Sequence, residues 1–238
     1  MTDLFARPST IDSQVLQLTG RPVLESWMGS DHPDQLRLAS YLDEVDNLTA
    51  SAVGDRRHLA VELSIGLVAT TSLDAGGNDL DNYLFPVVRR LGADRFDAAF
   101  AHKHHADSSW ISIGTAAVAA TTCEEPDLHV RTTSSAQSRA WKQQIHEACA
   151  AVVSTPLPPG PVAVDIQFTV ASTRNWSTLW KPAIDALGPV LGIPNPSRPF
   201  FPNDDRITEL GLHRSVDDQV GWDVLLGIWW RQAGSASG

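Results

Sequence analysis

The sequence predicts an α/β (α+β) protein built from a tandem pair of similar β-α-β-α-β-β units. Three observations predict it: an alternating strand pattern that occurs twice, a helix pattern that occurs twice with the same Pro and Gly positions, and two further strand candidates after each helix. We expect the halves at 15–122 and 127–232, with a boundary near 120–127 and packing as a pseudo-twofold pair. An N-terminal tail at 1–14 and a flexible C-terminal tail at 233–238 would flank them.

Each unit is expected to open with a short extended piece followed by a helix. These elements are predicted at 21–26 and 33–53 in the first half, and at 127–132 and 134–153 in the second. A strand should come next in both halves, because apolar and polar residues alternate there with a period of two. The two strand segments are His58–Ile65 and Pro161–Phe168.

A second helix is expected after each of these strands. Its pattern is Tyr83–Gly92 in the first half and Leu179–Gly188 in the second, and the two align without a gap. Proline suits a first helical turn and glycine suits a helix end. The alignment places Pro86 on Pro182 and Gly92 on Gly188, and it also places Leu91 on Leu187. The remaining strands are expected at 97–103, 109–119, 206–214 and 220–231. The alternative is that two unrelated α/β domains share this punctuation by chance.

Charge limits the classes of function. The chain has 238 residues, a formal net charge of −10 and a pI of about 5.1, which argues against a general nucleic-acid binder because phosphate contacts need clustered Lys and Arg. The charge is uneven, since 1–56 is acidic and is a candidate for contacting a protein partner, whereas 86–106 is locally basic.

Cysteine usage and hydropathy point to the cytoplasm. Cys123 and Cys149 lack a metal-type spacing, so we expect two small buried residues in a reduced setting. No apolar run approaches the roughly 18 residues of a membrane span, and the first residues show no secretory signal. A cytoplasmic protein without a membrane partner is therefore expected.

The stretch 77–82, Gly-Asn-Asp-Leu-Asp-Asn, is the most informative one for function. It places Asp79 and Asp81 two residues apart, directly before a predicted helix. Carboxylate oxygens are the ligands that hard divalent cations such as Mg²⁺ or Mn²⁺ prefer. Asp79 and Asp81 are therefore candidate metal ligands, and Asp94 is a third if its loop returns beside the helix start. The simpler interpretation is that one of the two aspartates only caps the helix.

The second half resembles the RusA-type Holliday-junction resolvases. The family's helix, Pro-containing loop and alternating strand are matched by Ser138–Ile145, Leu157–Gly160 and Val162–Val170. Four family positions carry the family's residue types: Lys181 falls on its Lys, Asp185 on its helical Asp, and Asp204-Asp205 on the Asp pair before the next strand. Three others do not, because Asn175, Ser177 and Thr178 stand where the family has Asp, Asp and Asn.

The first half departs from the family in the complementary way. Asp79, Asp81 and Asn82 match the family's Asp-x-Asp-Asn, but Phe85 replaces the Lys and Arg89 replaces the helical Asp. Asp94 is the best match to the second member of the Asp pair, and Ala93 replaces the first. Family proteins are small homodimers with two Mg²⁺-dependent sites, so this chain resembles such a dimer fused into one polypeptide, with each half altered differently.

The resemblance implies a divalent-metal-dependent endonuclease acting on branched or structured DNA, working as a monomeric pseudo-dimer or a homodimer with Mg²⁺ or Mn²⁺. The implied catalytic residues are Asp79, Asp81, Asp94 and Lys181, and the second-half remnants are Asp185, Asp204 and Asp205. Basic candidates for DNA contact are Arg89, Arg90, Arg95, Lys103 and Arg174. With one set of motif carboxylates, the enzyme should nick rather than resolve junctions symmetrically. The alternative is a module without activity that binds DNA structures or proteins.

Several motif-like residues have plainer interpretations. Lys181 is equally a solvated helix residue, and Asp204-Asp205 after Pro-Asn is turn chemistry. His102, Lys103, His104 and His105 are expected at a solvated strand end rather than at a metal, with His102 and His104 on one face. Tryptophans are expected to pack in the core or between the halves rather than to stack on bases; they are Trp176, Trp180, Trp222, Trp229 and Trp230.

Overall fold

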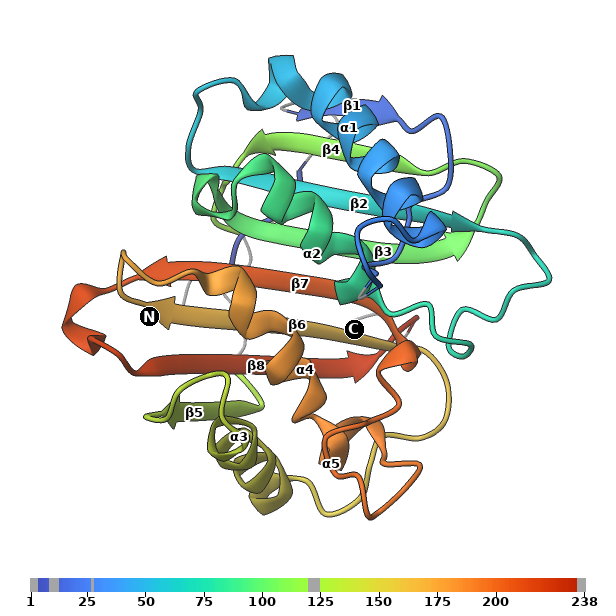
Figure 1. Ribbon diagram of the computed structural model, residues 1–238. Helices are drawn as coiled ribbons and strands as arrows, with labels where there is room; N and C mark the ends of the chain where they lie inside the picture. Colours follow the sequence, from blue (N-terminus) through green and yellow to red (C-terminus); the bar gives the residue numbers. More distant parts are fainter. Residues whose placement is uncertain (1–3, 9–12, 27, 120–124, 235–238) are drawn as a thin grey trace.

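Eight strands form one mixed sheet in the computed structural model, which describes residues 4–8, 13–26, 28–119 and 125–234. The order across the sheet is β1-β4-β2-β3-β7-β6-β8-β5, from top to bottom in Figure 1. The strands are β1 Ser13–Gln17, β2 Leu59–Leu67, β3 Phe96–His105, β4 Trp110–Thr115, β5 Leu128–Thr132, β6 Val162–Val170, β7 Ile207–Val216 and β8 Val224–Gln232. The protein is thus a mixed α/β fold around a single sheet.

The strand order reads the same from either edge of the sheet. The first half supplies β1-β4-β2-β3, and the second supplies β5-β8-β6-β7. In each half the two strands nearest the centre are parallel, and the other pairs are antiparallel. The halves meet where β3 pairs antiparallel with β7, in a register that sets Phe100 opposite Gly211, and His102 opposite Glu209. The end of β3 therefore lies beside the start of β7.

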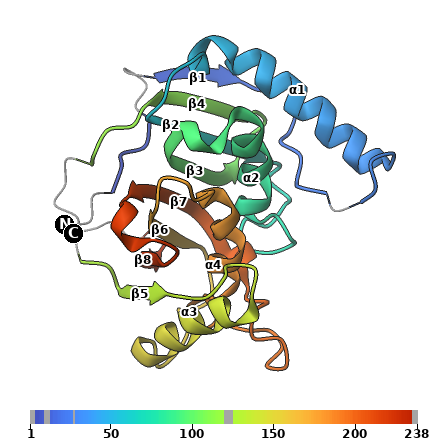
Figure 2. The same cartoon turned by 60° about the vertical axis from the view of Figure 1, so that its left-hand side comes forward.

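Helices cover one face of this sheet, as Figures 1 and 2 show. Over the first half lie α1 (Pro33–Val53) and α2 (Leu80–Leu91). Over the second lie α3 (Arg139–Val152), α4 (Trp180–Asp185) and α5 (Gly188–Leu191). The core between helices and sheet is one hydrophobic cluster that runs through both halves. On the other face, the described residues form a small buried apolar cluster of Ala60, Ala98 and Phe100, against which Phe5 packs.

The helix predicted at 33–53 has those bounds in the structure, but the strand predicted at 21–26 is wrong. The edge strand is instead β1, Ser13–Gln17, which pairs antiparallel with β4. Residues 21–26 run beside α2, where the Glu25 amide donates to the Asn82 carbonyl at 2.8 Å. The alternation in 13–17 is weak because most of these residues are exposed or half-buried at the sheet edge.

The helix predicted at 179–188 is broken in the structure. A 3₁₀ turn η2 (Trp176–Leu179) leads into α4, and α5 starts separately at Gly188 with a proline in its first turn. The chain passes very close to Gly188, where a β-carbon would lie 2.7 Å from Ile193. Trp222 corrects another expectation, since it precedes β8 and is 81% exposed rather than buried.

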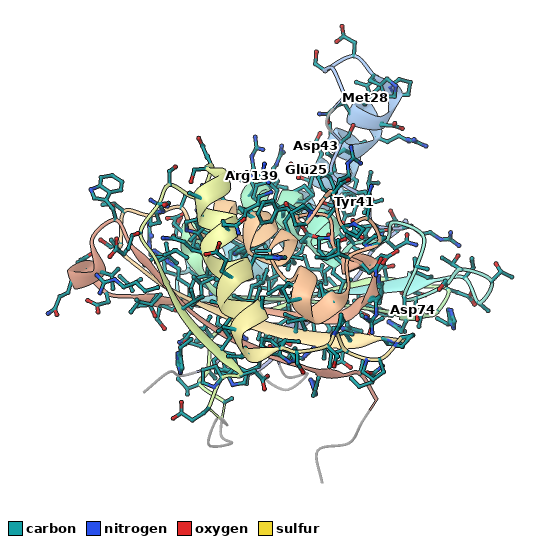
Figure 3. All side chains as sticks on the ribbon, turned by 90° about the horizontal axis from the view of Figure 1, so that it is seen from below. Glu25, Met28, Tyr41, Asp43, Asp74 and Arg139 are labelled. Carbon is teal, nitrogen blue, oxygen red and sulfur yellow. The ribbon has the colours of Figure 1, made fainter. Side chains whose placement is uncertain are left out.

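The first turns of α1 project away from the sheet, as Figure 3 shows with Met28 at their tip. Met28 is half exposed, whereas Tyr41 and Val45 further along the helix are buried against the core. Within the described ranges, no helix combines the length and hydropathy that crossing a bilayer requires. Cys149 is buried and unpaired as expected, while Cys123 lies outside the described residues.

Candidate functional site

Acidic residues from both halves converge on the ammonium group of Lys181. The Lys181 Nζ lies 2.9 Å from Asp204 Oδ2, 3.3 Å from Asp185 Oδ1 and 3.6 Å from Asp81 Oδ2. Asp81 belongs to α2 of the first half, whereas the other residues belong to α4 and to the 3₁₀ turn η3 (Asp204–Arg206) of the second. We call Asp79, Asp81, Lys181, Asp204 and Asp205 the acidic site.

The two motif carboxylates are strongly perturbed. Asp81 is only 4% exposed. Burial, opposed by Lys181 and assisted by repulsion from Asp204 and Asp79, raises its pKa to about 7. Burial also raises the pKa of Asp79, again with repulsion from Asp204. Carboxylates that repel one another across the two halves form a site that favours a cation.

Asp79 occupies the N-cap position of α2 but does not cap the helix. Its side chain accepts no capping hydrogen bond from the helix backbone. Its Oδ2 accepts instead from the Asn82 side-chain amide at 3.0 Å. The capping interpretation therefore does not account for this carboxylate.

Lys103 lies beneath the acidic site rather than on the surface. It is 3% exposed, and its Nζ donates to the carbonyls of Asn78 and Asp205, at 2.7 Å each. Burial lowers its pKa to about 8, opposed chiefly by Asp79. Asp205 also accepts a hydrogen bond from the Gly76 amide at 3.1 Å. These contacts tie the loop before α2 to the loop before β7, so the expectation that Lys103 is a DNA-contacting surface residue is wrong.

Asp94 does not join Asp79 and Asp81. Its carboxylate is exposed and lies 3.0 Å from Arg57 Nη1. The reason is geometric, because Asp94 follows the end of α2 and the motif lies at its start, 12 residues or about 18 Å earlier. The antiparallel β3·β7 pair instead brings the Asp204-Asp205 turn of the other half to the motif. The plain-turn interpretation of that pair is therefore incomplete.

A pocket lies at the opposite end of the β3·β7 pair from the acidic site, at the position that corresponds to it in the other half. We call it the second pocket. It has a volume of about 250 Å³, and its lining includes Asp94, Arg174, Asn175 and Arg214. Arg214 donates to the Asp94 carbonyl at 3.2 Å, much as Lys103 donates to the Asp205 carbonyl. Both positions combine residues of the two halves, but Asn175 stands in the second where Asp79 stands in the first.

The remaining basic candidates are dispersed. Arg90 lies 2.7 Å from Asp43 and 3.2 Å from Asp46, both on α1. Arg95 donates to the Gly54 carbonyl. Arg89 is exposed on α2, and Arg174 makes no hydrogen bond or ion pair through its side chain within the described ranges. No continuous basic stripe links these residues in the described part of the chain.

Sequence reasoning missed two charged neighbours of the acidic site. Lys142 on α3 lies 2.6 Å from Asp185, so the Asp185 carboxylate is shared between two lysines. Burial raises the pKa of Glu25, while Arg89 and Lys181 lower it. Neither residue has a spacing signal in the sequence, because both reach the site only through the packing of their segments on α2 and α4.

The tryptophans beside the second motif pack between the halves, as expected. Trp176 donates from its indole nitrogen to the Ala93 carbonyl at 2.8 Å. Trp180 meets Phe85 edge to face, with ring centroids 6.3 Å apart. Both indoles are buried, which leaves no face for a stacked base.

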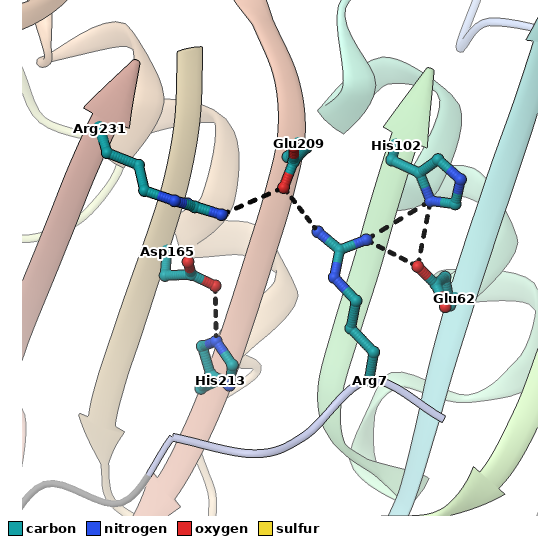
Figure 4. A network of polar contacts seen from close by, with 7 residues as sticks. All are labelled: Arg7, Glu62, His102, Asp165, Glu209, His213 and Arg231. Atoms are coloured by element: carbon teal, nitrogen blue, oxygen red, sulfur yellow. Dashed lines mark hydrogen bonds and ion pairs between the residues drawn. The ribbon is translucent and has the colours of Figure 1, made fainter. Parts of the chain in front are cut away.

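The open face of the sheet carries a separate polar network (Figure 4). Arg7 lies 2.7 Å from Glu62 and 3.6 Å from Glu209, so residues 4–8 are held across both halves. His102 pairs with Glu62 at 3.0 Å, and His213 pairs with Asp165 at 3.1 Å. His102 and His104 stack on one face as the alternation predicted, but the strand end is not simply solvated, since Lys103 is buried.

The acidic site fits a hard cation in donor chemistry. Asp79, Asp81 and Asp204 offer carboxylate oxygens, which suit Mg²⁺ or Mn²⁺, and their mutual repulsion favours a cation. In the described part of the chain, no three His, Cys, Asp or Glu side chains already form a metal-holding group. A bound cation would share these carboxylates with Lys181, whose pKa burial lowers but Asp81, Asp204 and Asp185 raise more strongly.

Comparisons with known proteins leave the family open. The resemblance to the resolvases rests on the short motifs and their order; the structure brings part of these motifs together around Lys181 and places Asp94 and Asn175 elsewhere. Strand order alone does not identify a family, because one fold serves many functions. Neither the comparison with protein-family models nor that with curated protein sequences gives a match to this chain.

Proposed function

We propose that this protein is a divalent-metal-dependent endonuclease that nicks one strand of branched or structured DNA. The observation that carries the proposal is the convergence of Asp79 and Asp81 of one half with Lys181, Asp204 and Asp205 of the other. Residues that match different parts of one nuclease motif thus meet in space although they lie about 100 residues apart.

The proposal includes a duplicated architecture, in which two RusA-like halves pack as a pseudo-dimer. It is supported by the palindromic strand order and by the symmetric β3·β7 register. A dimer fused in this way would form each site from both halves. That arrangement explains why each half retains only part of the motif.

Each polar group in the acidic site has a specific task in this proposal. Asp79, Asp81 and Asp204 would hold Mg²⁺ or Mn²⁺, which supplies activation of water and neutralises charge at the phosphodiester. Lys181 would place a second positive charge beside the reacting phosphate. Lys103 is a positioning residue, because its two hydrogen bonds fix the loops that carry the carboxylates.

One cut per encounter follows from the chemical difference between the two positions. Asp79 and Asp81 correspond to Asn175 and Ser177, which cannot supply the same negative charge. Paired cutting of a four-way junction needs two competent sites in one complex. A single chain should therefore nick a junction or trim a flap.

The second candidate is a DNA-structure or protein-binding module without activity. The observation that favours it is the ion pairing of Lys181 with three carboxylates, which already offsets their charge without a metal. The net charge of −10 also favours a protein partner over a general DNA ligand.

End-labelled four-way junctions and flaps, incubated with protein and Mg²⁺, test the proposal. Denaturing gels should show a single nick that Asp81→Asn abolishes and that the surface control Asp107→Asn retains. Symmetric, ligatable duplexes from a monomeric protein would refute the single-site assignment. Tight binding with no product from any substrate would favour the module instead.

A further inference from the structure

The second pocket contains a buried cation that no described acid balances. Arg214 on β7 is 9% exposed and lines the pocket. Its Nη1 and Nη2 donate to the neutral carbonyls of Asp94 and Ser172, at 3.2 and 3.5 Å. Its Nε finds no hydrogen-bond partner within the described residues. An arginine keeps its charge at all ordinary pH values, so an unpaired buried donor on it is costly.

We propose that this pocket binds a phosphate group, and that in the proposed nuclease it holds a phosphodiester of a DNA strand that is not cut. The identification of DNA rests on the proposed function, whereas phosphate binding stands on the pocket itself. Phosphate oxygens accept several charge-assisted hydrogen bonds at once, which suits two guanidinium groups. A volume of about 250 Å³ is ample for one phosphate and its neighbouring atoms.

Arg174 supplies the second guanidinium. It also lines the pocket, is half-buried, and makes no side-chain hydrogen bond or ion pair with any described residue. Asn175, next to it in the lining, adds an amide that can donate to an oxyanion. The pocket therefore offers Arg174, Arg214 and Asn175 as donors from two different elements.

The acids nearby are engaged with other partners. Asp94 lies in the lining, but its carboxylate is 3.0 Å from Arg57. Asp218 accepts from the Ser172 amide at 2.7 Å and is exposed. The arginines here outnumber the acids, since Arg57, Arg174 and Arg214 lie near Asp94 and Asp218. At the acidic site the balance is reversed, because Lys181 and Lys103 lie among five aspartates: Asp79, Asp81, Asp185, Asp204 and Asp205.

Losing the motif carboxylates thus changes what the position can bind. Aspartates at the places of Asn175 and Ser177 would repel a phosphate unless a metal lay between them. With an amide and a hydroxyl there, the arginines can meet the oxyanion directly. The two related positions would then contact two strands of one substrate, cutting at one and holding at the other.

Inorganic phosphate is the first probe. It should be added in EDTA, at constant ionic strength set with chloride, while the melting temperature of the whole chain is followed. Phosphate should raise the melting temperature of the wild type and of the surface control Arg37→Ala. Arg174→Ala should lose at least half of this rise, and Asn175→Asp should lose it through repulsion. A rise that both variants retain would overturn the proposal.

The DNA arm distinguishes a strand phosphate from free phosphate. The binding of a junction is measured in EDTA against salt, and Arg174→Ala should lower the slope of log K against log[salt] by about 1. An unchanged slope would overturn the DNA assignment even if free phosphate binds. Asp81→Asn should retain phosphate stabilisation, so a failure of the nuclease proposal would show in the cleavage assay alone.

Discussion

Replacing Asp81 by Asn should stabilise the protein, and more so at high pH. Asp81 is almost fully buried, with its pKa raised from 3.8 to about 7. Between these values the folded state holds a proton that the unfolded state releases, so this group makes unfolding easier as the pH rises. The full effect is about 4 kcal/mol, from about 3 pKa units at 1.36 kcal/mol each.

Most of this effect falls within an accessible pH range. Between pH 5 and pH 8 the contribution of Asp81 should change by about 2–3 kcal/mol. For a chain of 238 residues this corresponds to about 5–10 °C in melting temperature. At each pH, the free energy of unfolding of the wild type is subtracted from that of Asp81→Asn. The value at pH 5 is then subtracted from the value at pH 8. Titrations common to both proteins cancel in this double difference.

Thermal melts in EDTA, with urea unfolding at both pH values, provide the assay. Asp94→Asn is the matched control, because Asp94 is exposed and pairs with Arg57, and it should show no such double difference. Mn²⁺ at pH 8 should raise the melting temperature of the wild type and not that of Asp81→Asn. Equal variant differences at pH 5 and pH 8 would refute the argument that Asp81 is a strained buried charge.

Three further predictions concern the fold. Gly211→Ala should cost about 1–3 kcal/mol in urea unfolding, because its β-carbon would lie 1.9 Å from Asp165 Oδ1, whereas Gly20→Ala, which meets open space, should be close to neutral. Trp176→Phe should cost about 1–3 kcal/mol, because it removes buried indole volume and the hydrogen bond from the indole to the Ala93 carbonyl, which keeps only the Phe96 amide as donor, and Trp222→Phe, at an exposed side chain, serves as its control. Cys149 is buried with its pKa raised to about 12, so in a Cys123→Ser background it should react with a thiol reagent only after unfolding; reaction at the rate of a free thiol in native buffer would contradict its burial.

Local features of the fold could be predicted from the sequence, but the strands through which the two halves meet could not. The strand at 58–65 and the helix at 33–53 follow from patterns within one segment. The sequence makes Asp94 a third ligand beside Asp79 and Asp81 only if its loop returns to the start of the helix. In the structure, the antiparallel β3·β7 contact brings the Asp204-Asp205 turn to the motif instead, and no pattern within either half specifies this contact. Glu25 and Lys142 were missed for a different reason, because each reaches the site through the packing of its segment on a helix of its own half.

The β3·β7 contact also sets the distance between the acidic site and the second pocket. Main-chain hydrogen bonds run without interruption through eight strands, and the two related positions lie near opposite ends of the central pair. Because the sheet is continuous between these positions, we expect the distance between them to change little. A DNA ligand that contacts both positions must then match the distance between them. If its own phosphate spacing differs, the DNA has to bend or twist, and this deformation costs free energy.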